Sequence, residues 1–133
     1  MLLMRLETKE KFAFLQLSHY LARIDGEYGQ REQDVIEEYC VEMGIENSLM
    51  FDLEDFDLKS TLSAFKSLKS KKIVVLELMI LVHIDDKFDL KEHELTDEII
   101  NYFKLDNKEL KHFSAWGKAV SALYEQGKNF ISE

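Results

Sequence analysis

Two pairs of carboxylates recur in the sequence with the same spacing. Asp25 is followed seven positions later by Glu32, and Asp85 is followed seven positions later by Glu92. We expect each Asp where one helix ends and each Glu in the first turn of the next helix, so that a tight loop brings the two carboxylates together. Such carboxylates repel unless a positive charge lies between them. Because hard oxygen donors suit Ca²⁺ or Mg²⁺, the spacing indicates a divalent-cation site at one or both loops. Further oxygen donors in the loops are Glu27, Asp34, Asp86 and Asp89.

The same residues have a second interpretation that needs no metal. Glu32 and Glu92 are expected at the third position of a helix, where a carboxylate reaches back to the cap and favours the positive end of the helix dipole. Asp89 and Glu92 also have the spacing of a capping pair. Neither loop has the EF-hand spacing, because the twelfth position is Ile or Thr where a bidentate Glu is required. Helix capping and metal binding both remain open.

The two loops belong to a longer internal repeat, in which the chain matches itself at an offset of 60. Segment 22–45 aligns with segment 82–105 without a gap, and the match extends to units of about 9–56 and 69–116. Each unit is predicted to form a helix, an acidic loop, a second helix and a shorter helix. The identical pairs are Ile24/Ile84, Asp25/Asp85, Glu32/Glu92 and Glu38/Glu98.

Apolar residues at three- and four-residue spacing predict the helices of the first unit. The first helix has an apolar stripe that is expected to face the core, and the helix is expected to end near Asp25-Gly26. The stripe consists of Phe12, Leu15, His19 and Ala22, and Phe14, Leu17 and Leu21 widen it. The second helix is expected to begin near residues 29–31 and to stop near Gly44, a residue that readily adopts the left-handed helix terminus. Its predicted buried face consists of Val35, Ile36, Tyr39, Cys40 and Met43.

The rest of the chain also reads as helical. Segment 73–84 is almost wholly apolar apart from Glu77 and His83, and its length favours a buried helix. Asp57 is predicted to cap a helix with Leu58, Leu62, Phe65 and Leu68 on one side. Asp106 and Glu109 have the spacing of a capping box that opens the final helix. We therefore predict an all-α bundle of about seven helices that forms one domain over residues 1–133.

Composition limits the class of protein. The chain has 133 residues, no proline, five glycines and a net charge of −9. The absence of proline and the scarcity of turn dipeptides argue against a many-turned β-sandwich, and the acidity argues against nucleic-acid binding. A lone cysteine, Cys40, excludes an internal disulfide and favours a cytoplasmic location. No apolar run reaches the roughly 18 residues of a membrane span, so no membrane insertion is expected.

The negative charge is concentrated in one part of the chain. From Asp25 to Asp57 there are twelve acidic residues and one basic residue, whereas five lysines follow between positions 59 and 72. The acidity is therefore attached to the first loop and to the helix that follows it. This distribution favours a cation or a basic partner.

Motifs of catalysis are missing from the sequence. It contains no Gly-x-Ser-x-Gly, Walker or dinucleotide-binding glycine pattern. The four histidines show no spacing that would make two or three of them converge on a metal. A hydrolase that uses the loop carboxylates with a metal is the least favoured class, and the chain is predicted not to be an enzyme.

One family resembles this sequence. Ala22, Asp25-Gly26, Tyr28 and Glu32 are similar to the A-x-x-D-G-x-(apolar)-x-x-x-E signature of the TerB-like, tellurite-resistance family. The second copy has Asp86 in place of Gly and Val82 in place of Ala. The resemblance covers most of the chain and implies a bundle of about seven helices whose acidic loops bind a divalent metal. By motif match, the metal ligands would be Asp25, Glu32, Asp85 and Glu92.

The resemblance also implies a range of roles. TerB-like proteins are associated with tellurite and other chemical stress, with phage defence and with assemblies at the inner face of the membrane. The leading hypothesis is a non-enzymatic binding or scaffold module that reads Ca²⁺ or Mg²⁺ and presents a surface to a protein partner. The alternative is a purely structural interaction domain whose acidic face contacts a basic partner without metal.

Overall fold

The computed structural model describes residues 1–24, 26, 28–47, 51–84 and 89–132. Within these ranges the chain forms a short 3₁₀-helix and six α-helices, with no β-strand. The all-α prediction is therefore confirmed at the level of fold class. The elements are η1 (Leu3–Arg5), α1 (Thr8–Arg23), α2 (Gln30–Met43), α3 (Leu58–Leu62), α4 (Leu68–His83), α5 (Leu90–Phe103) and α6 (Asn107–Ile131).

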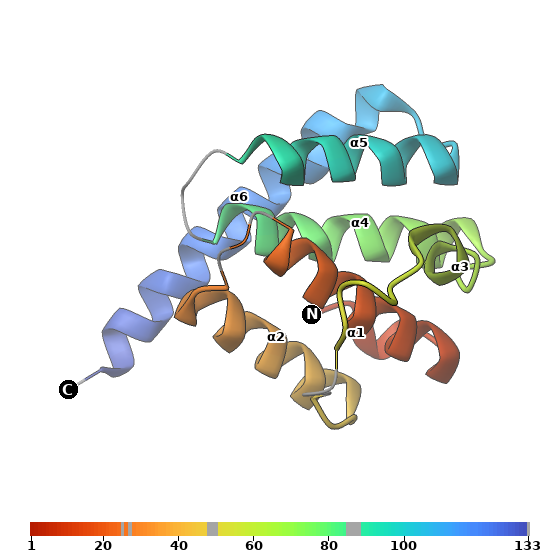
Figure 1. Cartoon of the computed structure of the whole chain (residues 1–133). Coiled ribbons are helices and arrows are strands. Elements are labelled where there is room, and N and C mark those ends of the chain that lie inside the picture. The colour runs from red at the N-terminus through yellow and green to blue at the C-terminus, as the bar shows by residue number, and fades with distance from the viewer. Residues whose placement is uncertain (25, 27, 48–50, 85–88, 133) are drawn as a thin grey trace.

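Helix α4 is the centre of the arrangement (Figure 1). It packs against α1 and α5, and its most extensive contact is with α6. Helix α2 packs against α1, and η1 lies between α2 and α4, which brings the N-terminus into the middle of the molecule. The C-terminal part of α6 extends beyond the other helices in this view. The almost uninterrupted apolar sequence of α4 follows from this position, because a helix covered on several sides buries residues all around its axis.

Four helices begin and end at positions 60 residues apart. Helix α4 has the bounds of α1 shifted by 60, and α5 has the bounds of α2 shifted by the same number. The second helix of each pair ends at a left-handed residue, Gly44 with φ 70° and Lys104 with φ 57°. The helix bounds thus recur at the offset on which the sequence repeat was identified.

The expected count of about seven helices was too high for the described residues. The shorter helix predicted after α2 is absent from residues 45–47 and 51–56, which have no helical structure. The Asp52 carboxylate accepts a hydrogen bond from the backbone N–H of Glu54 at 2.9 Å. Because Asp side chains bond the backbone two residues on, they stabilise turns in competition with helices. In the second unit the corresponding residues are part of the long helix α6.

The helix that Asp57 caps is also shorter than predicted. The Asp57 carboxylate accepts the N–H of Ser60 at 3.1 Å, which confirms the cap, but α3 ends at Leu62. A new helix begins at Leu68, where the hydroxyl of Ser67 accepts the N–H of Ser70 at 3.0 Å. Leu68 is therefore not on α3 and is 60% exposed. The serine cap explains the break. The Ser67 hydroxyl accepts the Ser70 N–H, which would bond to a backbone carbonyl if one continuous helix ran through this segment.

Most predicted core positions are buried, with one clear exception in α1. All five residues predicted for the buried face of α2 are inside the molecule. In α1, however, Phe12 is 52% exposed, whereas Phe14 and Leu21 are fully buried. The buried face is centred on Phe14, Ser18 and Leu21 because α1 packs against α2, α3 and α4 together. Phe12 lies on the opposite side of the helix.

Helices α4 and α6 approach each other closely at Gly117. A Cβ atom at this position would lie 2.4 Å from the Cβ of Met79 and 2.6 Å from its carbonyl carbon. Only glycine allows this distance between the helices without movement of the backbone. The contact sets the position of the following turns of α6, which carry Val120 and Tyr124 toward α2.

Candidate functional site

The four predicted metal ligands divide into two that the structure describes and two that it does not. Glu32 and Glu92 lie in the first turns of α2 and α5, where the sequence predicts them. Asp25 and Asp85 lie outside the described residues, as do the further donors Glu27 and Asp86. The description therefore covers one carboxylate of each predicted pair.

Glu32 and Glu92 occupy equivalent places at the start of their helices. Each is the third residue of its helix and is only 3% exposed. The Glu32 carboxylate accepts the N–H of Gly29 at 3.3 Å, and the Asp89 carboxylate accepts the N–H of Glu92 at 2.8 Å. The predicted contact of Glu32 with its cap and the predicted Asp89 cap of α5 are thus present. The Glu32 and Asp89 carboxylates therefore each stabilise the start of a helix.

A metal centre is not assembled by the described residues alone. Within the part of the chain that the structure describes, no three Asp, Glu, His or Cys side chains are placed to hold a metal ion. Because Asp25 and Asp85 are outside that part, the pairs Asp25/Glu32 and Asp85/Glu92 are not tested as cation sites. Both stay predictions.

The histidine nearest to the first loop is packed inside the protein. His19 is 1% exposed, and its Nδ1 lies 3.2 Å from the Nη2 of Arg23. A guanidinium only donates hydrogen bonds, so Nδ1 accepts and the Nε2–H donates to the Asn47 Oδ1 at 2.8 Å. This is the neutral imidazole. Burial lowers the pKa of His19, as does the Arg23 charge, whereas the hydrogen bond to Asn47 acts in the opposite direction.

Aromatic rings complete the support of the first loop. The guanidinium of Arg23 lies 4.2 Å from the ring centre of Tyr28, two residues after Gly26. The ring of Phe51 stacks on His19 with a centroid distance of 5.5 Å. These contacts join the end of α1, the loop and the segment after α2. In the second unit, His83 Nε2 forms a hydrogen bond with Ser114 Oγ at 2.8 Å.

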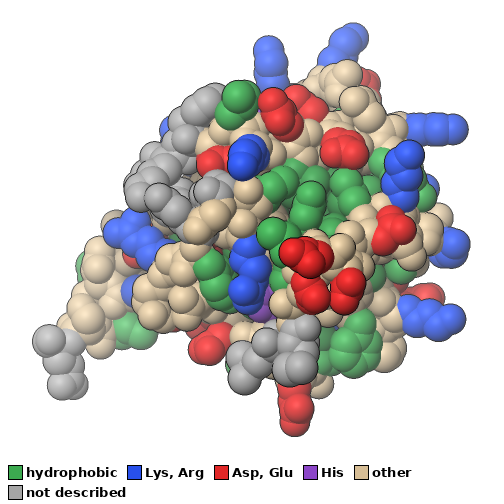
Figure 2. Space-filling view, viewed as in Figure 1, with side chains coloured by type: hydrophobic (Ala, Val, Ile, Leu, Met, Phe, Trp, Pro, Cys, Tyr) green, Lys and Arg blue, Asp and Glu red, His purple; other side chains and the backbone are tan. Residues whose placement is uncertain are grey.

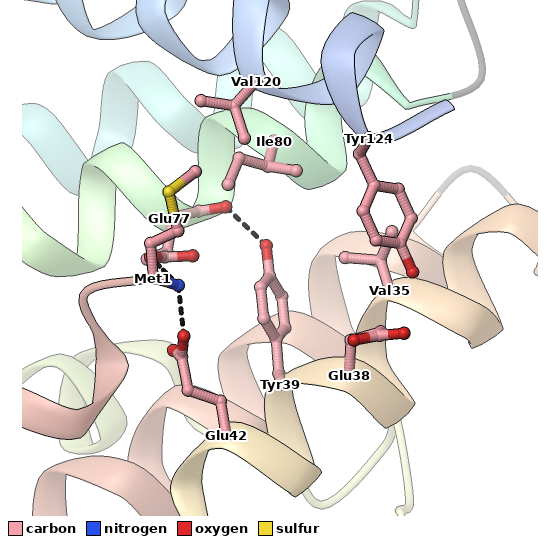
Figure 3. A pocket seen from close by; sticks show the side chains of 9 residues that line it. All are labelled: Met1, Val35, Glu38, Tyr39, Glu42, Glu77, Ile80, Val120 and Tyr124. Carbon is pink, nitrogen blue, oxygen red and sulfur yellow. Dashed lines mark hydrogen bonds and ion pairs between the residues drawn. The ribbon is translucent and has the colours of Figure 1, made fainter. Parts of the chain in front are cut away.

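A second and separate feature is an acidic pocket between α2, α4, α6 and the N-terminal segment. It encloses a cavity of about 230 Å³, and Figure 3 shows the nine residues that line it. Glutamates 42 and 77 lie at one end, next to Met1, and Glu38 and Tyr124 lie at the other. The walls between them are apolar and come from Val35, Ile80 and Val120. The pocket therefore combines a charged end with a hydrophobic body.

Glu77 is the most unusual residue of this pocket. It lies in the middle of α4 and is 0% exposed. Its Oε1 accepts the N–H of Leu2 at 2.8 Å and lies 3.2 Å from the α-ammonium group of Met1. Its Oε2 is buried and has no hydrogen-bond partner among the described residues. Burial raises the pKa of Glu77, although the Leu2 amide and the Met1 ammonium act in the opposite direction.

Glu42 brings a second carboxylate to the same point. It projects from α2, forms an ion pair with the Met1 ammonium and accepts the N–H of Leu3 at 3.0 Å. Burial lowers the pKa of the Met1 ammonium, but the Glu42 and Glu77 carboxylates outweigh this effect, so that its pKa is raised overall. Two carboxylates from different helices thus hold one ammonium group (Figure 3).

Tyr39 fixes the wall between the two ends of the pocket. Its hydroxyl donates a hydrogen bond of 2.5 Å to the backbone carbonyl of Glu77, and its ring meets Phe14 edge to face at 5.0 Å. Burial raises the pKa of Tyr39 well above its usual value, and the Glu77 charge adds to this effect. The hydroxyl therefore stays protonated and joins α2 to α4 beside the Glu77 carboxylate.

The far end of the pocket joins α6 to α2. The Tyr124 hydroxyl faces Glu38, and burial together with this hydrogen-bonded carboxylate raises the pKa of Tyr124 to about 12. One turn later, Lys128 lies 3.6 Å from the Asp34 carboxylate and 4.9 Å from the Tyr124 ring centre. These side chains hold the C-terminal half of α6 next to the acidic side of α2.

The cysteine of the chain does not contribute a nucleophile to the pocket. The only cysteine, Cys40, is buried and does not line the pocket, and burial raises its pKa to about 11. A thiol that remains protonated at neutral pH is a poor nucleophile. Sequence reasoning missed Glu42 and Glu77 as site residues. The available signal was Glu77 itself, a carboxylate inside an apolar helix, which requires a partner when it is buried.

The surface charge is mixed on the face that Figure 2 shows. Acidic side chains lie beside a central hydrophobic area, while Lys and Arg side chains project around the upper and right-hand edges. This face is therefore not uniformly acidic. The acidic surface next to the pocket is formed by residues of α2.

None of the helices within the described ranges combines the length and apolar character needed to cross a membrane. The geometry thus provides a small pocket lined by three glutamates, and two helix starts that each carry a buried glutamate. Comparison of the chain with protein-family models, with curated proteins and with solved structures gave no match.

Proposed function

We propose that the chain is a non-enzymatic binding module that recognises a basic segment of a partner protein through the acidic side of α2 and the adjoining pocket. This is the metal-free alternative of the sequence hypothesis. The observation that carries it is the position of the acidic side of α2 along the mouth of a pocket whose carboxylates already hold a positive charge. A cytoplasmic location is the accompanying proposal from the cysteine usage.

The acidic side of α2 is continuous. It consists of Asp34, Glu37, Glu38 and Glu42, which recur at three- and four-residue spacing and therefore share one face of the helix. Glu37 and Glu38 are exposed, and the other two are partly exposed. Lys128 pairs with Asp34 at one end of the face. A basic segment is the complementary partner, because opposite charge on an exposed face raises the rate of association and the specificity of binding.

An apolar residue lies within this acidic face. Val41 is 81% exposed and stands between the positions of Glu37 and Glu42 on the helix. A lysine side chain combines a charged end with an apolar stem, which covers apolar surface while its charge remains paired. The acidic side of α2 with Val41 therefore fits a lysine-containing segment better than it fits a free metal ion.

A calorimetric titration with a short peptide of lysine and alanine, acetylated at its N-terminus, tests the proposal. Binding is expected at low ionic strength and is expected to weaken as salt is added, since the charges are exposed. The double substitution Glu37→Lys/Glu38→Lys should weaken binding at least tenfold. Charge reversal at Glu94 and Glu98, which are exposed on α5, changes the net charge equally and is the matched control.

Two results would count against the proposal. One is the absence of measurable heat at low ionic strength. The other is an equal loss in the α2 and α5 variants, since it would mean that the peptide responds to net charge alone. A loss confined to the α2 variant supports a defined binding face.

The divalent-cation function is a second candidate with separate support. Glu32 and Glu92 are both nearly buried at equivalent helix starts, next to the loops that contain Asp25 and Asp85. A role in tellurite or chemical stress, and in membrane-associated assemblies, rests on the resemblance to the TerB-like family. Titration of Ca²⁺ and Mg²⁺ into chelator-treated protein, with thermal melting alongside, tests the cation function. An unchanged melting temperature at about millimolar cation would exclude it, because a ligand that binds only the folded state must stabilise it.

A further inference from the structure

We propose that the pocket between Glu42 and Glu77 is a binding site for a primary alkylammonium group, which the α-ammonium of Met1 occupies within the chain. The inference rests on the proposed function and names the chemical group that the pocket takes. An alkylammonium group is found at the end of a lysine side chain and in small alkylamines, so both sources share this chemistry.

The first support is the state of the Glu77 carboxylate. It is fully buried, and its Oε2 lacks a hydrogen-bond partner among the described residues. Figure 3 shows the carboxylate directed toward the space between Met1 and Tyr39. A buried carboxylate with an unused oxygen carries a large desolvation cost unless a charged donor approaches it. The pocket thus has an acceptor that a ligand can satisfy.

The second support is the group that the structure already places there. The Met1 ammonium contacts both Glu42 and Glu77. In addition, the Leu2 N–H donates a hydrogen bond to the Glu77 carboxylate, and the Leu3 N–H donates one to the Glu42 carboxylate. An ammonium has three donors and no acceptor. Its donors can therefore be shared between two carboxylates that come from two helices. The same contacts are available to any ammonium of similar size.

The geometry selects against two other kinds of cation. Ca²⁺ requires six to eight oxygen ligands, whereas two of the carboxylate oxygens here already accept backbone N–H groups. A guanidinium is planar and prefers a carboxylate that is free to accept two parallel bonds. Glu77 cannot provide this, because its Oε1 is bonded to Leu2. A compact ammonium matches the remaining positions.

The body of the pocket fits an alkyl chain. Apolar side chains of Val35, Ile80 and Val120 line the space beyond the charged end. The cavity of about 230 Å³ is smaller than the roughly 300–1,000 Å³ of sites for drug-sized ligands. A short methylene chain with a terminal ammonium places its charge on the glutamates and its apolar part on these walls. The acidic side of α2 then contacts the residues that flank such a lysine.

Calorimetric titration of n-butylamine, with n-butanol as the neutral analogue, tests the site. It is carried out on the full chain and on the same chain acetylated at the α-amino group of Met1, which removes the internal ammonium. We expect n-butylamine to bind the acetylated chain at least tenfold more tightly than the unmodified chain. We expect n-butanol to bind neither form. Equal affinity for the amine and the alcohol, or no gain on acetylation, would overturn the proposal.

Substitutions place the binding in this pocket. In the acetylated chain, Glu77→Gln and Glu42→Gln should each weaken n-butylamine binding at least tenfold. Glu98→Gln should leave the binding unchanged, because Glu98 is an exposed residue of α5. Circular dichroism checks that each variant is folded. If Glu77→Gln does not fold, Glu42→Gln decides, because its carboxylate is 21% exposed and its loss leaves the core intact. An unchanged affinity in Glu42→Gln would overturn the proposal.

A second experiment distinguishes a lysine side chain from a free alkylamine as the ligand, and it distinguishes the ammonium site from the proposed function. The lysine peptide is compared with the same peptide acetylated at its lysine Nζ atoms. Loss of peptide binding on acetylation, together with amine binding, supports a lysine of a partner as the ligand. Amine binding without peptide binding supports a free alkylamine and removes the proposed function. Peptide binding without amine binding overturns the ammonium site and leaves the proposed function in place.

Discussion

Gly117→Ala is the substitution whose effect follows most directly from the geometry. The added Cβ would lie 2.4 Å, 2.6 Å and 2.8 Å from the Cβ, carbonyl carbon and carbonyl oxygen of Met79. Ordinary contacts of a Cβ begin near 3.4 Å, so α6 must move away from α4 by about 1 Å. These Met79 atoms belong to the backbone or are fixed to it. A change of side-chain rotamer therefore cannot relieve the overlap.

Two opposing effects determine the magnitude. Alanine is favoured over glycine inside a helix by about 1 kcal/mol, and this would stabilise the protein if the site were open. Overpacking of a close contact costs about 1 to 3 kcal/mol, and backbone contacts place Gly117 at the upper end of that range. The expected result is a decrease in the free energy of unfolding of about 2 kcal/mol.

Urea denaturation followed by circular dichroism measures this difference, and the same helix provides the control. Gly127 is also in α6, but a Cβ there would meet no atom within 4 Å. Gly127→Ala should therefore raise the free energy of unfolding by up to about 1 kcal/mol. The same chemical change is thus expected to have opposite signs at two positions of one helix.

The result that would refute this reasoning is a Gly117→Ala variant as stable as the unmodified chain. It would mean that α4 and α6 do not approach at this point. The position of Val120 and Tyr124 over the pocket would then lose its support. A destabilised but folded variant should also bind n-butylamine more weakly, since both residues line the pocket and move with α6.

Two further predictions concern His19 and Cys40. The pKa of His19 is lowered by burial, so the unfolded chain, with a histidine pKa near 6.5, binds the proton more readily. The contribution of His19 to the free energy of unfolding should fall as the pH drops below about 6.5, by at most ~1.4 kcal/mol per pH unit. Urea denaturation over a pH series should show this slope in the unmodified chain but not in His19→Gln, and equal slopes would contradict a neutral His19. The Cys40 thiol is buried with a pKa of about 11, so an alkylating reagent at about pH 8 should modify it only after denaturation. Prompt reaction of the native protein would contradict its burial.

The sequence was sufficient to predict features that depend on local signals. Apolar periodicity located α1 and α2, and the length of the apolar segment and the repeat at an offset of 60 extended the prediction to α4 and α5. The caps at Asp57 and Asp106 were identified from side-chain type and position. The Asp57 carboxylate accepts from Ser60, and the Asp106 carboxylate accepts from the N–H of Lys108 at 2.9 Å. Gly44 ends α2 in the left-handed conformation. Each of these signals acts within a few residues, so it can be read without knowledge of tertiary packing.

Features that depend on packing were not predictable in the same way. Of the apolar residues predicted to face the core in α1, Phe12 alone is exposed, whereas Leu15 and His19 of the same stripe are buried. Periodicity alone cannot decide where the contact of a helix with its neighbours ends. The break between α3 and α4 was missed, because the capping role of Ser67 competes with an apolar pattern that continues through Phe65 and Leu68. Both errors come from a local pattern that is compatible with two arrangements.

The acidic pocket could not be assembled from spacing, because its parts are distant in the chain. The hydrogen bond from Leu2 to Glu77 spans 75 positions, and the bond from Tyr39 to the Glu77 carbonyl spans 38. The lone glutamate in an apolar helix was visible, but its partners Met1 and Leu2 in the N-terminal segment and Tyr39 on α2 were not. The predicted pairs of the two loops, in contrast, are local, and they await a test with Ca²⁺ and Mg²⁺.

Carboxyl ¹³C NMR of Glu77 and Glu42 during titration of the acetylated chain with n-butylamine shows whether these two side chains bind the ammonium group. The Cδ signals report on the two carboxylates whose oxygens are proposed to bind the ammonium. We expect saturable shifts of both Cδ signals, with the Glu98 signal unchanged. Unchanged Glu77 and Glu42 signals, or equal shifts of all glutamates, would contradict it.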